Sequence, residues 1–174
     1  MSTQEELNYA LFCALDDNEL ENAKLLVTQG AEVHRITPVE SWSLLHKIMM
    51  ETDVTQPAPI ECLKFLIEQG LDVNGIHYGG YTPLIYAARR KSAESIRVLL
   101  ENGATKTVNH KNESGVAPLQ MAMGTKPYDY DSIKTLLEFG ADPDLPNRAG
   151  NTPRRKLDIA VGIPEGIKAL FAKY

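Results

Sequence analysis

The sequence predicts an all-α solenoid built from repeated pairs of short helices. The first support is a recurring pattern: an apolar pair, two or three further residues, then a glycine followed by a small or apolar residue. The pattern reaches its glycine at Gly30, Gly70, Gly103 and Gly140, at intervals of 40, 33 and 37 residues. Self-similarity at such a period is the sequence signature of a repeat architecture.

Helix starts and ends recur within this period. Thr82 lies 21 residues before Gly103 and is followed by Pro83, and the related pair Ala117 and Pro118 occurs in the next unit. Threonine caps a free backbone N–H, and proline at the first helical position lacks only a donor that would have no partner. Glycine ends a helix in a left-handed turn. We therefore expect the first helix of a unit to begin at such a pair and the second to end at the glycine.

Apolar residues recur at helical spacing between these signals. The clearest examples are Ile96, Leu99, Leu100, Ile133, Leu136 and Leu137. Polar, turn-rich segments follow the glycines at 72–75, 105–107 and 142–144, and they suit tight hairpins. Each unit is therefore predicted to consist of two helices and a short β-hairpin connection.

Several segments resemble the ankyrin repeat. They are YALFCA from Tyr9, SLLHKI from Ser43, TPLIYAA from Thr82, APLQMA from Ala117 and GNTP from Gly150. The resemblance covers nearly the whole chain and implies one ankyrin-repeat domain over residues 1–174. Its expected units are 4–36, 37–75, 76–110, 111–146 and 147–174.

The last unit departs from the pattern, because Arg154, Arg155 and Lys156 stand where the resemblance implies apolar residues. Such a departure is typical of a terminal repeat, whose outer face meets water. The arginine at position 154 replaces an expected core leucine, and Gly162 and Gly166 weaken the helices. We expect this unit to be the least stable part of the chain.

Composition excludes several classes of function. A chain of 174 residues that is 43% hydrophobic suits a single domain that folds without metals or disulfides. Its formal charge of −5 has the wrong sign for binding a phosphate backbone, so no nucleic acid partner is expected. The start MSTQEEL is not a secretory signal, and no apolar stretch is long enough to cross a bilayer. We expect no membrane association and a cytoplasmic location.

No residue pattern points to catalysis, a cofactor or a metal. Cys13 and Cys62 lie far apart in apolar helical patterns, so both are expected to be buried, reduced and unpaired. The resemblance implies a structural role for His46. The other histidines, His34, His77 and His110, lie in hairpins of different repeats. Histidines spread in this way do not form a ligand shell, so we predict a non-enzyme with neither a cofactor nor a metal site.

Exposed aromatic and arginine residues are the candidates for binding a partner, since interface hot spots are enriched in these types. The resemblance places Trp42, Tyr78 and Tyr81 on hairpin arms that line a concave surface, and Arg89 and Arg90 on its floor. The alternative is that Trp42 packs over the joint between the first two repeats and that both arginines are ordinary solvated charges.

Two units gain length between their helices, at residues 51–59 and 125–131. Insertions on a shared face often mark a binding face, which adds Tyr128 and Tyr130 as candidates. Both loops are expected to project from one edge of the solenoid. The alternative is neutral loop growth, because closure entropy rises slowly with length.

These features predict a non-catalytic module that binds one folded protein and inhibits or sequesters it. Small ankyrin-only proteins that the chain resembles include kinase inhibitors and immunity proteins that block a toxin. The free chain is expected to be a monomer. Two other hypotheses are a structural scaffold or self-associating spacer, and a regulatory subunit of an enzyme.

Overall fold

A computed structural model describes residues 3–37, 41–50 and 57–174. The described residues form α-helices and one 3-10 helix, and they contain no strand. The helices are α1 (Thr3–Asp16), α2 (Leu20–Thr28), α3 (Leu44–Met50), α4 (Ile60–Glu68), α5 (Pro83–Arg90), α6 (Ala93–Glu101), η1 (Ala104–Thr107), α7 (Pro118–Ala122), α8 (Tyr130–Glu138), α9 (Pro153–Ile159) and α10 (Glu165–Phe171).

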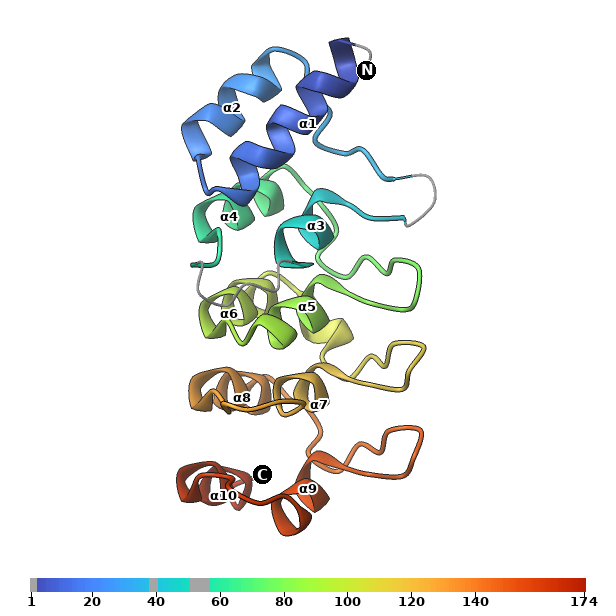
Figure 1. Ribbon diagram of the computed structural model, residues 1–174, viewed down its shortest axis with the longest axis vertical. Coiled ribbons are helices and arrows are strands. Elements are labelled where there is room, and N and C mark those ends of the chain that lie inside the picture. Colours follow the sequence, from blue (N-terminus) through green and yellow to red (C-terminus); the bar gives the residue numbers. More distant parts are fainter. Residues whose placement is uncertain (1–2, 38–40, 51–56) are drawn as a thin grey trace.

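The helices stack as antiparallel pairs in two layers (Figure 1). Helices α1, α3, α5, α7 and α9 form one layer, which we call the inner layer, and α2, α4, α6, α8 and α10 form the outer layer. The connections between pairs project beside the inner layer along the whole stack. The all-α solenoid that the sequence predicts is confirmed. None of the described helices is long and apolar enough to span a membrane.

Local capping explains where the helices of the third pair begin and end. The hydroxyl of Thr82 accepts a hydrogen bond from the Ile85 amide at 3.2 Å, and Pro83 occupies the first turn of α5. Ser92 caps α6 in the same way through the Ser95 amide. After α6, Gly103 adopts a φ of 102°, a left-handed conformation that side chains disfavour. The sequence signals for this pair are therefore confirmed.

The hairpins predicted after each pair form as tight turns. In each turn one backbone hydrogen bond joins the two arms: His77 N to Tyr81 O at 3.0 Å, Asn112 N to Val116 O at 3.1 Å and Asn147 N to Asn151 O at 2.9 Å. Within each turn a second backbone bond is donated by the amide of Gly80, Gly115 or Gly150. One bond between the arms is too little to count as a strand, so the predicted β character is not seen in the described residues. The turn at Gly80 packs closely against the next turn, which contains Glu113. A Cβ at Gly80 would lie only 2.9 Å from the Glu113 amide nitrogen, so a side chain does not fit at this position.

Asparagine side chains connect successive turns. The amide of Asn74 donates to Gly103 O at 3.2 Å, and the amide of Asn109 donates to Gly140 O at 2.9 Å. Each asparagine thus satisfies a carbonyl that the end of a later helix leaves free. These bonds fix the spacing of the turns along the solenoid.

The hydrophobic core runs without interruption through the stack. It is built from fully buried aliphatic side chains, and burial of each contributes about 1.5–3 kcal/mol. Examples from successive pairs are Leu15, Leu45, Leu63, Leu84, Ile96, Leu136 and Ile167. Each helix pair therefore completes its core against its neighbours.

The two cysteines differ in burial, although both are unpaired as predicted. Cys62 is fully buried in α4, and burial raises the pKa of its thiol to about 11. Cys13 is only half-buried, so the prediction that it lies in the core is wrong. Its helix, α1, belongs to the first pair of the stack and has a neighbouring pair on one side only.

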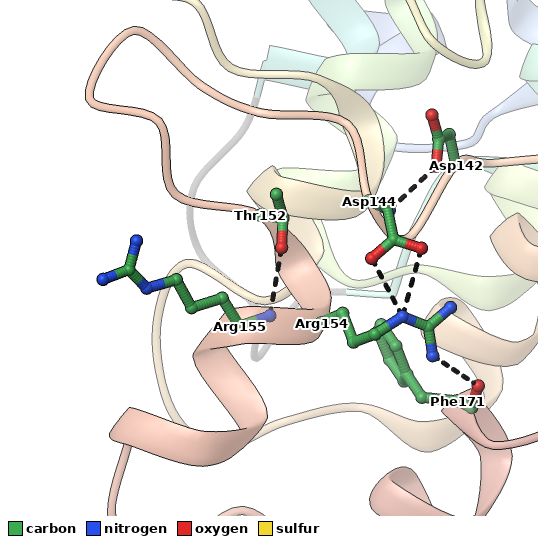
Figure 2. A network of polar contacts seen from close by, with 6 residues as sticks. All are labelled: Asp142, Asp144, Thr152, Arg154, Arg155 and Phe171. Carbon is green, nitrogen blue, oxygen red and sulfur yellow. Dashed lines mark hydrogen bonds and ion pairs between the residues drawn. The ribbon is translucent and has the colours of Figure 1, made fainter.

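In the last pair, Arg154 makes polar contacts in place of the core packing expected of a leucine (Figure 2). Its Nε atom lies 2.9 Å and 3.1 Å from the two carboxylate oxygens of Asp144, and Nη1 donates to Phe171 O at 3.0 Å. Thr152 caps the same helix by accepting from the Arg155 amide at 3.0 Å. The arginine thus joins the preceding turn, α9 and α10.

Candidate functional site

The candidate site is the surface formed by the inner layer and the turns beside it, which we call the inner face. Three of the predicted binding residues lie on or beside the turns: Trp42 and Tyr81 are half-buried, and Tyr78 is 77% exposed. Arg89 is exposed on α5. The remaining predicted residues lie elsewhere or are buried.

Trp42 and Tyr81 meet through His77, which sequence reasoning did not include. The His77 ring packs edge-on against Trp42 at 5.7 Å and stacks on Tyr81 at 5.4 Å, measured between ring centres. Tyr86 stacks on both His77 and Tyr81, and its hydroxyl is hydrogen-bonded to His77 Nε2 at 2.5 Å. We call Trp42, His77, Tyr81 and Tyr86 the aromatic cluster. It joins the second and third helix pairs. Trp42 also lines a hollow together with Tyr9 and Phe12 of α1, so it lies near the joint between the first two repeats as well.

His46 also connects the second helix pair to the turn that precedes the third pair. Its Nε2 lies 2.9 Å from the Gly75 carbonyl oxygen, and its Nδ1 lies 2.9 Å from Ser43 Oγ. Because a carbonyl can only accept, Nε2 carries the proton; because the Ser43 amide donates to Nδ1 at 3.3 Å, Nδ1 is unprotonated and the ring is neutral. Burial lowers the pKa of His46 to about 4, and the nearby His77 adds a smaller lowering effect. This arrangement is structural, as the resemblance implies.

The two adjacent arginines have different environments. Arg90 is buried, and its Nη2 donates to the Pro57 carbonyl oxygen at 3.0 Å, in the segment that leads into α4. The prediction that Arg90 lies exposed on the floor of the binding surface is therefore wrong. Successive helical residues point about 100° apart, so only Arg89 faces solvent.

The predicted loop at residues 125–131 is held against the molecule instead of projecting freely. Lys91 Nζ donates to Thr125 O at 2.7 Å and to Pro127 O at 2.6 Å. Lys156 Nζ donates to the Met123 carbonyl and, at 3.3 Å, to Gly124 O. The connection between α7 and α8 is thereby attached to Lys91, the residue after α5, on one side and to α9 on the other. In the other predicted loop, residues 51–56 lie outside the described part of the chain.

Tyr128 and Tyr130 take different positions in and after this loop. Tyr128 is half-buried, and Lys156 Nζ lies 5.7 Å from its ring centre. Tyr130 is 41% exposed at the first residue of α8. The two tyrosines therefore do not form one exposed patch, and the lysines that attach the loop were not singled out from the sequence.

Two hollows lie at opposite ends of the inner face. The first, of about 300 Å³, is lined by residues of α1, α3 and the first turn, among them Tyr9, Phe12, Glu32, Arg35, Trp42 and Lys47. The second, of about 560 Å³, lies between α7 and α9 and is lined among others by Gln120, Met121, Met123, Pro153, Lys156 and Ile159. Tyr9 and Ile159 are 63% and 64% exposed. The motif that begins at Tyr9 indicates a repeat and not a binding residue, and Ile159 belongs to no motif, so the sequence did not indicate either as a site residue.

The described residues contain no group of three or more His, Cys, Asp or Glu side chains able to hold a metal ion.

The four side chains of the aromatic cluster are held by stacking and by the bond between His77 and Tyr86, an arrangement that forms a rigid surface. What the inner face offers chemically is aromatic area, apolar hollows and charges at their rims.

Comparison with known proteins decides the family. A model described as "Ankyrin repeats (3 copies)" matches residues 10–110, which is more than half of the chain. The chain belongs to the ankyrin-repeat family. Ankyrin repeats are generally protein–protein interaction modules, and the exposed aromatic and apolar side chains of the inner face agree with such a role.

Individual relatives match over about half of this ankyrin-repeat chain. "Ankyrin repeat, SAM and basic leucine zipper domain-containing protein 1" is 32% identical over 91 residues in Rhinolophus ferrumequinum, covering 52% of this chain and 19% of the relative. The protein of the same name in Homo sapiens is 31% identical over 94 residues, covering 54% of this chain and 20% of the relative. The match thus spans about a fifth of each relative's length.

Proposed function

We propose that this ankyrin-repeat chain is a non-catalytic module that binds one folded protein on its inner face and inhibits or sequesters it. The observation that carries the proposal is the aromatic cluster, in which Trp42 lines the first hollow and Tyr81 stacks on the same His77 ring that Trp42 contacts. Interface anchors are enriched in Trp, Tyr and Arg and sit near the centre of the contact. Tyr78 and Arg89 flank this cluster with exposed side chains, so they complete the proposed centre.

Rigidity supports binding over a structural role for the same residues. Trp42, Tyr81 and Tyr86 are all held by ring contacts with His77, so little side-chain entropy is lost when a partner covers them. The bound protein would lose access to the surface that the inner face covers. Occlusion of this kind is the mechanism by which we propose inhibition, as in the kinase inhibitors and toxin-immunity proteins that the chain resembles.

The test is affinity capture from the native host, followed by measurement of binding between the purified pair. Tyr78→Ala and Arg89→Ala are expected to weaken binding at least tenfold, which corresponds to about 1.4 kcal/mol each. Both side chains are exposed, so the melting temperature should stay nearly unchanged. Tyr81→Ala is a less clean variant than these, because it also removes two ring stacks.

Lys134→Ala in the outer helix α8 serves as the control and should leave affinity unaltered. Unchanged binding by both Tyr78→Ala and Arg89→Ala would exclude the aromatic cluster as the centre of the binding site. Loss of the partner's activity on complex formation would support inhibition, whereas an active complex would favour a scaffold. A dimer of the isolated chain that buries the inner face would instead support self-association.

A further inference from the structure

The second hollow combines apolar walls with an exposed apolar border. Met121 and Met123 contribute from α7 and its end, and Ile159 contributes from α9. Ile159 is 64% exposed, and the neighbouring Val161 is 87% exposed. A space of about 560 Å³ accommodates one or two large aliphatic or aromatic side chains. Exposed apolar side chains beside a hollow are a feature of binding sites.

Lys156 lines this hollow, and two further lysines lie near Lys156 or near the end of α9. Lys91 and Lys156 bind carbonyl oxygens of the connection between α7 and α8. Lys126 belongs to that loop, and its amino group lies next to Gly162, shortly after the end of α9. The distance is 2.8 Å from Lys126 Nζ to the position that a Cβ on Gly162 would occupy. None of the three pairs with a carboxylate in residues 3–37, 41–50 and 57–174. Their positive charge is therefore not neutralised by an ion pair within the described chain.

The charge around the lysines contrasts with that of the whole protein. Residues 1–80 contain 4 Lys and Arg against 13 Asp and Glu, whereas residues 81–174 contain 14 against 10. Residues 81–174 are therefore basic, although the whole chain has a net charge of −5. Burial lowers the pKa of both Lys91 and Lys156; for Lys91, attraction by the Asp129 carboxylate raises the pKa and repulsion from Lys156 has a smaller lowering effect. An approaching carboxylate would favour the charged form of both lysines.

We propose that the second hollow binds an acidic, apolar segment of a partner protein. An aliphatic or aromatic side chain of that segment fills the space between Met121 and Ile159, and flanking carboxylates pair with Lys126 and Lys156. The inference rests on the proposed function and names the chemistry of the partner. The apolar walls favour a peptide over a nucleic acid, whose backbone offers charge but no aliphatic group.

The probe is a random 12-residue peptide library displayed on phage and selected against the whole immobilised chain. The expected winners carry two or more Asp or Glu residues around Leu, Ile, Met or Phe. A synthetic copy of the most frequent winner is then titrated by fluorescence anisotropy at two salt concentrations, and its site is mapped by amide chemical shifts. Affinity should fall as salt rises, since the lysines are near the surface.

Matched variants test whether the selected peptide binds at the second hollow. Lys156→Glu and Ile159→Asp should each weaken it at least tenfold, and Lys126→Glu severalfold. Lys106→Glu, an identical charge reversal at an exposed residue of η1, should leave affinity unchanged. Lys156 also holds the loop, so unfolding of that variant would leave Lys126→Glu and Ile159→Asp to decide the question. Selection of basic or uncharged peptides, or binding that tolerates both of these variants, would overturn the proposal.

The same titration separates this inference from the proposed function. Tyr78→Ala lies outside the second hollow and should leave peptide affinity unaltered while weakening the natural partner. If Tyr78→Ala has no effect on the partner but Lys126→Glu and Ile159→Asp still abolish peptide binding, the hollow is a binding site and the aromatic centre is not.

Discussion

The imidazole of His46 lies 2.9 Å from the carbonyl oxygen of Gly75, a bond that connects helix α3 to the turn of the next repeat. It requires the Nε2–H tautomer of a neutral ring, and burial holds the pKa at about 4. The unfolded chain has no such constraint, so its histidine titrates near 6.5. Protonation therefore favours the unfolded state.

The first prediction concerns pH. The stabilisation should be complete above pH 7 and should decrease as pH falls from about 6.5 to 4, because only the unfolded state takes up the proton over that range. The loss is about 3 kcal/mol at the lower end. Urea unfolding at pH 7.5, 5.5 and 4.5 measures it. His46→Gln should be less stable at pH 7.5 and should show a shallower pH slope, whereas an unchanged slope would contradict the assignment.

The second prediction concerns the thiols. Cys62 is buried with a pKa of about 11, while Cys13 is half-buried on α1. A thiol reagent at pH 8 should therefore modify one cysteine quickly and the other only after unfolding, since thiolate is the reactive form. The variant Cys13→Ser should abolish the fast phase. Fast labelling that persists in this variant would show that α4 is accessible.

The third prediction separates the adjacent arginines of α5. Arg90→Ala should lower the free energy of unfolding by about 1.5–3 kcal/mol, since it removes a charged hydrogen bond to the Pro57 carbonyl. Arg89→Ala should change stability by less than about 0.5 kcal/mol, because the side chain is exposed. Urea titration of both variants provides the comparison. Equal effects would mean that the burial of Arg90 contributes nothing.

The fourth prediction concerns the terminal repeat. Amides of residues 151–174 should exchange with solvent faster than those of 82–100, because the last pair packs against one neighbour only. Arg154→Ala should widen this difference, since Arg154 joins Asp144 to the Phe171 carbonyl. Arg97→Ala, which removes contacts between the outer helices α6 and α8, provides a control. Equal protection of the two segments in the unaltered protein would show that the terminal repeat is not weak.

The sequence was sufficient to predict the fold because residues within a repeat mark where its helices begin and end. Thr82 and Gly103 mark the beginning and end of one helix pair by capping and by a left-handed turn, and both signals depend only on local backbone chemistry. Side-chain environment depends on distant residues. No local signal distinguishes Arg89 from Arg90, and the contact of Arg90 with Pro57 joins residues 33 positions apart.

The candidate site was predictable only in part for the same reason. The turn positions of Trp42 and Tyr81 follow from the repeat register, but the ring that joins them belongs to His77, and its role depends on stacking between two units. The second hollow arises from exposed residues without a motif, such as Ile159. The repeat pattern thus located the face, and tertiary packing determined which side chains line it.

Lys91 and Lys156 anchor one loop from two different repeats, and this affects how the solenoid comes apart. In a simple array each repeat senses only the next, so unfolding propagates inward from an end one unit at a time. Here, melting of α9 withdraws Lys156 from the Gly124 carbonyl and loosens the loop that Lys91, the residue after α5, also holds. Loss of the last helix pair therefore also weakens the contact between the fourth pair and the third, beyond its effect on the immediate neighbour.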